Sequence, residues 1–293
     1  MWTIKNRPSY NRDKLRYPSD LTDAEWAHIR PLIPPAKRGG GKRRVDMHEV
    51  VNGVMYVLST GCQWRYIPKD LPPRSTVNDY FCLWSYNGTL EKIHDVLYVK
   101  CRERAEREAS PTACIIDSQS VKSAEKGGSA SIHMGEPAPG ALDPGDAGKL
   151  IKGKKRHVLV DRLGLLLHAL VTSADVQDRD GGLMVLSTLF ARFPFLKKLF
   201  ADTAYAGPVF QDGLAVAMPG LETEIVRRRD RAKGFVVLPQ RWIVERTIAW
   251  LNRCRRLAKD CRAVQRSQLT LHLDRASSPA RAAAYLSWLN VLA

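Results

Sequence analysis

The sequence lacks long apolar runs and any secretory leader. No segment approaches the roughly 18 to 20 consecutive apolar residues that a membrane span requires. The first twenty residues are polar and basic, without the apolar stretch of a signal peptide. We therefore expect a cytoplasmic protein with no membrane partner.

The cysteines form no recognisable pattern. All six stand singly, with no CxxC pair and no histidine at zinc-ligand spacing. In a reducing compartment such residues are expected as buried thiols rather than as disulfides or zinc ligands.

Acidic residues are few. The chain has 30 Asp and Glu against 46 Lys and Arg, a formal net charge of +16. So large an excess favours a polyanionic partner, nucleic acid before membrane. Basic residues recur at 37–44, 149–156, 227–233 and 253–262, which predicts a binding surface spread over several elements and a nucleoid-associated protein.

Composition divides the chain into four parts. Residues 1–19 are predicted as a flexible arm and residues 20–107 as a small all-helical domain. Residues 111–262 are predicted as an α/β domain, interrupted at 123–148 by a loop rich in Gly, Ala, Pro and Ser. Residues 263–293 form a divergent C-terminal tail.

The helical domain has the pieces of a DNA reader. Thr22 and Glu25 form a capping box that opens a first helix, and a second helix is expected over about 46–59. Ser75 or Thr76 is expected to cap a third. Helix-turn-helix proteins are built from such pieces, although the connection here is longer than usual, and a bundle that only packs is the alternative. The basic, aromatic connection favours DNA contact.

The second domain alternates strands and helices. Apolar runs at 113–117, 155–161, 163–174 and 196–202, with one helix before the last run, predict a mixed sheet with flanking helices. A long amphipathic helix follows over 239–260, about six turns.

Three acids stand at positions suited to metal binding. Asp117 and Asp202 each end an apolar strand, where ligands bind in open α/β sheets. Glu245 is the acid within the basic face of the long helix, and an ion pair with Arg241 is the alternative for it. Three carboxylates can hold two Mg²⁺ ions for in-line displacement at phosphorus. Asp161, Asp175, Asp178 and Asp180 are expected in turns and caps.

Several motifs resemble one family of enzymes. The motifs are IIDSQSVK (115–122), GKKRHVLVDRLGLLL (153–167), ADVQDRDGG (174–182), LFADTAYAG (199–207) and KGFVVLPQRWIVERTIAWLNRCRRLAKD (233–260). In this order they resemble the DDE transposases of bacterial insertion sequences, specifically the insertion-sequence-five group. The segments LTDAEWAHIRPLIPP and GCQWRYIPKDLPPRSTVNDYF resemble that group's N-terminal DNA-binding region.

The resemblance implies a fold, a reaction and a site. The fold is ribonuclease-H-like, and Asp117, Asp202 and Glu245 are the catalytic, metal-binding carboxylates for two Mg²⁺ ions, with Mn²⁺ as a substitute. The reaction is cleavage at the element's inverted-repeat ends, followed by attack of the freed 3′-hydroxyl on target DNA. The partners are double-stranded DNA and a second copy of the chain, as a homodimer or larger assembly on DNA. Among the candidate DNA contacts, the resemblance points to Arg241 and, in place of the family's lysine, to Arg253 or Arg256. The basic segments described above add Lys154, Lys155, Arg156, Arg43, Arg44, Arg65 and Arg74.

The chain departs from the family at two positions. The wider branch has a tyrosine seven residues before the glutamate and a lysine seven after it, where this chain has Leu238 and Asn252. Arg253 or Arg256 could replace the lysine. Two other functions stay open: a catalytically inactive DNA-binding remnant that represses the element, and a ribonuclease-H-like nuclease without strand transfer.

Overall fold

The computed structural model divides the chain into two compact units, with a boundary in sequence between Cys101 and Arg102. The short segment Arg253–Leu257 groups with the first unit. The structure describes residues 11–36, 39, 42–122, 153–189, 192–226 and 240–258. The predicted loop at 123–148 and the tail at 263–293 lie outside these ranges, and each unit is described by itself.

The first unit is helical, as predicted. Its elements are α1 (Asp23–Ile29), η2 (Arg30–Leu32), α2 (Met47–Thr60), η3 (Trp64–Tyr66), α3 (Arg74–Tyr86) and most of α4 (Thr89–Arg104). The capping box is confirmed: Thr22 accepts from the Glu25 backbone N–H, and Glu25 accepts from that of Thr22. The α2 helix ends at Gly61, whose φ of 69° is the left-handed conformation that glycine tolerates.

The predicted cap of the third helix is wrong. The α3 helix begins at Arg74, before both predicted caps, and its N-cap is Pro73, which has no side-chain cap hydrogen bond. The proline side chain has no hydrogen-bond acceptor, so the helix starts without a side-chain cap.

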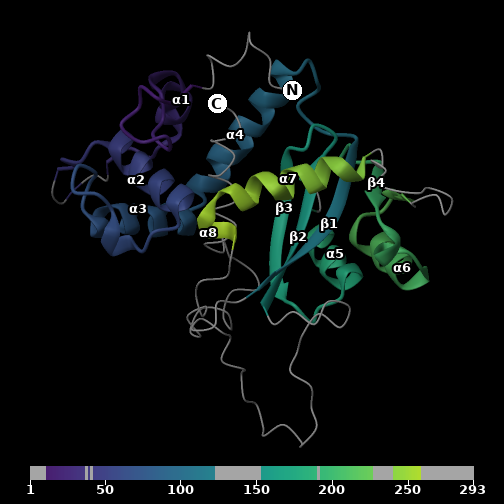
Figure 1. Cartoon of the computed structure of the whole chain (residues 1–293). Coiled ribbons are helices and arrows are strands. Elements are labelled where there is room, and N and C mark those ends of the chain that lie inside the picture. The colour runs from purple at the N-terminus through teal and green to yellow at the C-terminus, as the bar shows by residue number, and fades with distance from the viewer. Residues whose placement is uncertain are drawn as a thin grey trace, which may run out of the picture. The chain divides into compact units, whose positions relative to one another are not determined.

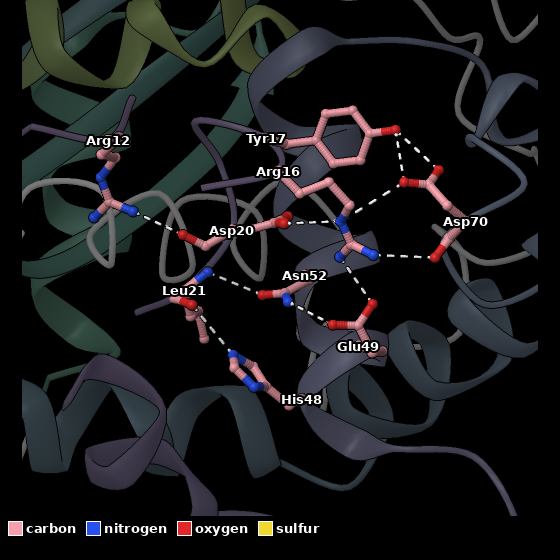
Figure 2. Close-up of polar contacts among 9 residues, drawn as sticks. All are labelled: Arg12, Arg16, Tyr17, Asp20, Leu21, His48, Glu49, Asn52 and Asp70. Atoms are coloured by element: carbon pink, nitrogen blue, oxygen red, sulfur yellow. Dashed lines mark hydrogen bonds and ion pairs between the residues drawn. The ribbon is translucent and has the colours of Figure 1, made fainter. Parts of the chain in front are cut away.

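The arm predicted to be flexible is anchored where the structure describes it. The Arg16 guanidinium contacts Glu49 of α2 at 2.8 Å, Asp20 at 3.1 Å and the Asp70 carbonyl oxygen at 3.0 Å (Figure 2). The Tyr17 hydroxyl lies 2.9 Å from the Asp70 carboxylate. Residues 12–20 are thus tied to α2 and to the connection before α3, while residues 1–10 lie outside the described ranges.

We expect Arg16→Met to lower the free energy of unfolding of the helical unit by about 1 kcal/mol. The side chain is one-third exposed, so solvent screens its ion pairs, but the guanidinium has three separate partners. Urea unfolding of both proteins measures the loss. Lys69→Met, at an exposed position of the same unit, is the control and should change stability little. Equal effects from the two substitutions would show that Arg16 does not anchor the arm.

The second unit contains a five-stranded mixed sheet. The strands β1 (Ala113–Lys122), β2 (Gly153–Asp161), β3 (Leu166–Ser173), β4 (Lys198–Ala201) and β5 (Glu222–Ile225) lie in the order β3-β2-β1-β4-β5. The first three form an antiparallel meander, and β1, β4 and β5 are parallel (Figure 1). The predicted mixed sheet with flanking helices is confirmed.

The remaining elements of this unit connect and cover the sheet. They are α5 (Asp178–Ser187), η4 (Thr203–Tyr205), α6 (Pro208–Ala217) and α7 (Arg241–Arg253). The short α8 (Arg255–Ala258) follows α7 and, up to Leu257, groups with the first unit. The α5 helix contacts β1, β2 and β3, and Val185 and Leu186 are fully buried.

Two elements of the later part of the chain also differ from the sequence prediction. The α6–β5 segment was not predicted, because β5 (ETEI) is short and alternates exposed with half-buried residues. The long helix predicted over 239–260 ends at Arg253, and α8 begins after Cys254. Nothing in the residue types around Cys254 accounts for the break.

The described cysteines differ in their exposure to solvent. Cys114 and Cys254 are buried as expected, whereas Cys82 is exposed; Cys261 lies outside the described residues. Within the described part of the chain, no helix combines the length and apolar character needed to cross a membrane.

Candidate functional site

The parallel pairing of β1 with β4 places Asp117 and Asp202 at the same level. Ala113 pairs with Lys198 and Ile115 with Phe200. Asp117 follows Ile115 by two residues within β1, and Asp202 follows Phe200 by two residues, directly after the end of β4 at Ala201. Continued beyond the paired residues, the same register brings Asp117 and Asp202 side by side. Because side chains alternate between the faces of a strand, both also share the face of Ile115 and Phe200.

Asp117 lies inside a strand and not at its end. The sequence predicted that β1 stops at this residue, but β1 continues to Lys122 and Asp117 pairs with Val158 of β2. The Asp117 carboxylate accepts a 2.7 Å hydrogen bond from the Ser118 backbone N–H, which orients it.

The electrostatics of Asp117 connect all three predicted carboxylates. Burial, the largest cause, and the charges of Asp202 and Glu245 together raise the pKa of Asp117 from its ordinary 3.8 to about 6. The Ser118 backbone N–H and the Arg241 guanidinium oppose that rise. Because charges act on a pKa only at short range, the carboxylates of Asp202 and Glu245 belong to the surroundings of Asp117.

Arg241 joins the other two acids. One of its guanidinium nitrogens, Nη2, lies 3.6 Å from Asp202 Oδ2 and 3.6 Å from Glu245 Oε1. The alternative ion pair between Arg241 and Glu245 is therefore present, and the same arginine reaches Asp202. Asp202 itself caps η4, accepting from the Ala204 backbone N–H at 2.9 Å. The Glu245 side chain is 54% exposed, so its carboxylate is accessible from solvent.

The donor set suits a hard divalent cation. Carboxylate oxygens are the ligands that Mg²⁺ and Mn²⁺ accept, and Asp117 bears the electrostatic cost of two neighbouring negative charges. Among the described residues, no three His, Cys, Asp or Glu side chains are gathered closely enough to form a ready metal cluster. Arg241 instead stands between two of the acids. The chemistry of the three carboxylates fits a hard divalent metal ion.

A polar group behind Asp117 was missed by sequence reasoning. Ser118 Oγ donates to Asp178 Oδ1 at 2.8 Å, and the buried Lys155 ammonium lies 3.0 Å from the same carboxylate oxygen. Asp178 was expected only as a turn or cap residue. The acidic run DVQDRD signalled a site of some kind, but only the fold shows which acid meets β1 and β2.

Tyr205 was also missed. Its side chain is buried beside the acids, and burial followed by the charges of Asp117, Asp178 and Asp202 raises its pKa well above the usual value. A Cβ at position 182 would lie 2.7 Å from its ring, so Gly182 of α5 provides the room for it. The Tyr205 phenol thus lies within the electrostatic influence of these acids.

The predicted DNA contacts have different surroundings. Lys155 is buried and bonds Asp178 and the Val176 carbonyl oxygen, so its position differs from that of a surface contact. Arg156 donates to Asn252 Oδ1 at 3.4 Å, and Arg43 donates to the Pro34 carbonyl oxygen at 3.0 Å. The exposed candidates are Arg44, Arg65, Arg74 and Arg253. Lys154 and Arg241 are half-buried, and the side chain of Arg256 lies outside the described part.

The raised pKa of Asp117 predicts a pH-dependent stability. Ionised Asp117 costs stability, because its folded pKa of about 6 exceeds the ordinary 3.8. The cost is absent below the ordinary value, grows as pH rises from about 4 to 6, and is constant above 6. In metal-free protein at pH 7.5, Asp117→Asn should therefore raise the free energy of unfolding by about 1 to 2 kcal/mol, after allowance for solvent screening.

Near pH 4, the rise in the free energy of unfolding caused by Asp117→Asn should be only a small fraction of its value at pH 7.5. Urea unfolding in a chelator at both pH values measures it, with Asp212→Asn, at an exposed acid of α6, as the control. A loss of stability at pH 7.5 would contradict the proposed crowding of negative charge.

Comparisons with known proteins match both units. Residues 21–94 match a family described as transposases of the IS4/5 family, and residues 108–274 match the family described as "Transposase DDE domain". The "Insertion element IS402 uncharacterized 16.2 kDa protein" of Burkholderia cepacia is 29% identical over 130 residues, 42% of this chain and 84% of that protein. The protein assigned as the transposase of IS402, from the same organism, is 31% identical over 138 residues, 43% of this chain and 61% of that protein.

Two solved structures of Mos1 transposase are distant. A paired-end complex with the left transposon end is 11% identical, covers 65% of this chain and 61% of that chain, and has a TM-score of 0.23. A pre-cleavage transpososome is 11% identical; the match covers 88% of this chain and 79% of that chain, with a TM-score of 0.25. These low scores add nothing to the family match.

Proposed function

Because this chain belongs to the DDE transposases, the family whose domain spans residues 108–274, we propose that it cuts DNA at the inverted-repeat ends of its insertion sequence and joins the freed 3′-hydroxyls to target DNA. The observation that carries the proposal is the shared level of Asp117 and Asp202 across the β1–β4 pair, with Arg241 linking Asp202 to Glu245. DDE transposase domains generally use divalent metal ions.

The three carboxylates have one role in this proposal: they hold the divalent ions, two Mg²⁺ or Mn²⁺. Bound ions of this kind activate the attacking oxygen and stabilise the leaving oxygen at phosphorus. Asp117 of β1 and Asp202, directly after β4, would bind the ions from the sheet, and Glu245 would bind them from α7. The Ser118 N–H fixes the Asp117 carboxylate, and Arg241 favours the ionised form of Asp117 by opposing the rise of its pKa.

Basic residues around the site support a DNA substrate. A net charge of +16 provides the attraction, which should weaken steeply with salt because each phosphate contact releases counterions. The family's lysine position holds Asn252, and Arg156 donates to its side chain. Arg156 therefore joins Arg253 and Arg256 as a candidate to supply the missing positive charge. Double-stranded DNA bound as two paired ends favours at least a homodimer.

A labelled inverted-repeat end tests the proposal. The end is taken from the DNA that flanks the gene and incubated with the protein and Mg²⁺ or Mn²⁺. We expect a nick at the element boundary that leaves a 3′-hydroxyl, and later a product joined to target DNA. A gel shift without a nick would identify an inactive DNA-binding remnant. Nicking without any joined product would identify a nuclease.

A further inference from the structure

The turn between β2 and β3 is held rigidly. Asp161, fully buried, accepts from the backbone N–H groups of Leu163 at 2.9 Å and Leu165 at 2.8 Å. Its other carboxylate oxygen pairs with the Arg102 guanidinium. Gly164 at the centre of the turn has a φ of 85°, which strongly favours glycine. The backbone of Asp161–Leu165, named the seat below, is therefore fixed.

Helix α7 binds the seat through the two residues that follow Glu245. Arg246 Nη2 donates to the Leu163 carbonyl oxygen at 2.8 Å. The Thr247 hydroxyl donates to the Gly164 carbonyl oxygen at 2.8 Å and lies 3.1 Å from the Ile243 carbonyl oxygen of its own helix. Because a hydroxyl has one proton to donate, the shorter contact, to Gly164, is the stronger of the two hydrogen bonds.

The approach of α7 to the seat leaves no room for a side chain. A Cβ at position 164 would lie 2.8 Å from Arg246 Nη2, 3.0 Å from Thr247 Oγ1 and 3.3 Å from Ile243 Cγ2. The Arg246 guanidinium is itself held between two indole rings of α7, 4.5 Å from the centroid of Trp242 and 4.6 Å from that of Trp250. Such cation–π contacts restrict the arginine to the orientation that reaches the seat.

The seat belongs to the strand pair that carries Asp117. Asp161, the last residue of β2, pairs with Cys114 of β1, three residues before Asp117. A rigid connection therefore runs from Asp117 through the β1–β2 pair and the seat to Arg246 and Thr247. Glu245 adjoins Arg246 on the same helix, so the seat fixes where along the sheet this carboxylate stands.

We propose that Arg246 and Thr247 are positioning residues, which dock α7 on the seat and so hold Glu245 at the correct distance from Asp117 for shared metal binding. The proposal rests on the proposed function, because it takes Glu245 to be a metal ligand. Removing a supporting partner of a metal ligand typically lowers metal affinity or activity by about 10- to 100-fold.

Three variants of the full-length protein test this docking. Thr247→Val keeps the shape and removes the hydroxyl, whereas Thr247→Ser keeps the hydroxyl. Thr188→Val is the matched control, because the Thr188 hydroxyl donates to Val185 in α5, away from the seat. Hydrogen exchange of the α7 amides, Mn²⁺ affinity and the rate of end nicking are measured for each.

We expect Thr247→Val to speed α7 exchange and to weaken Mn²⁺ binding by about 10-fold or more, with nicking partly restored at high Mn²⁺. The Mn²⁺ affinities of Thr247→Ser and of Thr188→Val should each stay within about threefold of that of the unsubstituted protein. The proposal would be overturned if the α7 amides of Thr247→Val exchanged at the same rate as in the unsubstituted protein. It would also be overturned if they exchanged faster while the Mn²⁺ affinity stayed unchanged. If Thr247→Val does not fold, Arg246→Lys gives the same measurements with the Leu163 contact weakened.

The test of the positioning role of Arg246 and Thr247 can be distinguished from the test of the proposed DNA cleavage. A protein that binds Mn²⁺ but never nicks its end contradicts the proposed function. Exchange in α7 and Mn²⁺ affinity still decide whether the seat positions Glu245.

Discussion

Glu245→Gln should lower the rate of end cleavage by about 10³-fold while leaving end binding intact. A metal ion contributes several kcal/mol to the transition state of phosphoryl transfer, and each 1.36 kcal/mol is a factor of ten in rate. The amide keeps the size of the glutamate but removes the charge that holds a cation. The Glu245 side chain is 54% exposed, so the fold does not depend on it.

The measurement compares nicking and gel shift on the same labelled end. Glu222→Gln, at an exposed position of β5, is the control and should cut at the original rate. If Glu245→Gln retained metal-dependent cleavage, Glu245 would be only the partner of Arg241.

Arg102→Leu should destabilise the α/β unit by about 3 to 5 kcal/mol. Asp161 is fully buried and pairs with Arg102, so removing the arginine leaves a negative charge in the protein interior without its partner. The Arg102 Nε also donates to the Glu108 carbonyl oxygen at 2.6 Å, and that acceptor loses its partner as well. The loss should extend to α7, because Asp161 organises the seat.

Calorimetry of the full chain checks this expectation. For a unit of this size the melting temperature should fall by roughly 6 to 20 °C. Lys198→Met breaks the surface pair with Glu224, in which both side chains are about half exposed, and should cost at most about 1 kcal/mol. Similar losses from the two substitutions would mean that the buried pair is no more important than a surface one.

The sequence predicted the elements with strong local signals. The capping box of Thr22 and Glu25, the apolar runs of β2 and β3 and the amphipathic pattern of α7 all have local causes, and each element is present. The family resemblance added Asp117, Asp202 and Glu245, and the β1–β4 register now explains how the first two meet.

Features that depend on distant residues were not predictable. Residues 118–122 of β1 are mostly polar and lack the apolar run that marks a strand, and they stay in the sheet because β2 pairs with them throughout. Asp178 meets Ser118 across a separation of 60 residues, and Thr247 meets Gly164 across 83. No local pattern records such contacts. The anchoring of Arg16 likewise depends on Glu49 and Asp70.

Mn²⁺ binding followed by electron paramagnetic resonance tests the central claim most directly. At pH 7.5, with an inverted-repeat end present, the unsubstituted protein should bind Mn²⁺. Asp117→Asn, Asp202→Asn and Glu245→Gln should each weaken that binding by at least about tenfold, because each removes one charged oxygen ligand. Binding of equal strength in all four proteins would contradict a metal site built from these three carboxylates.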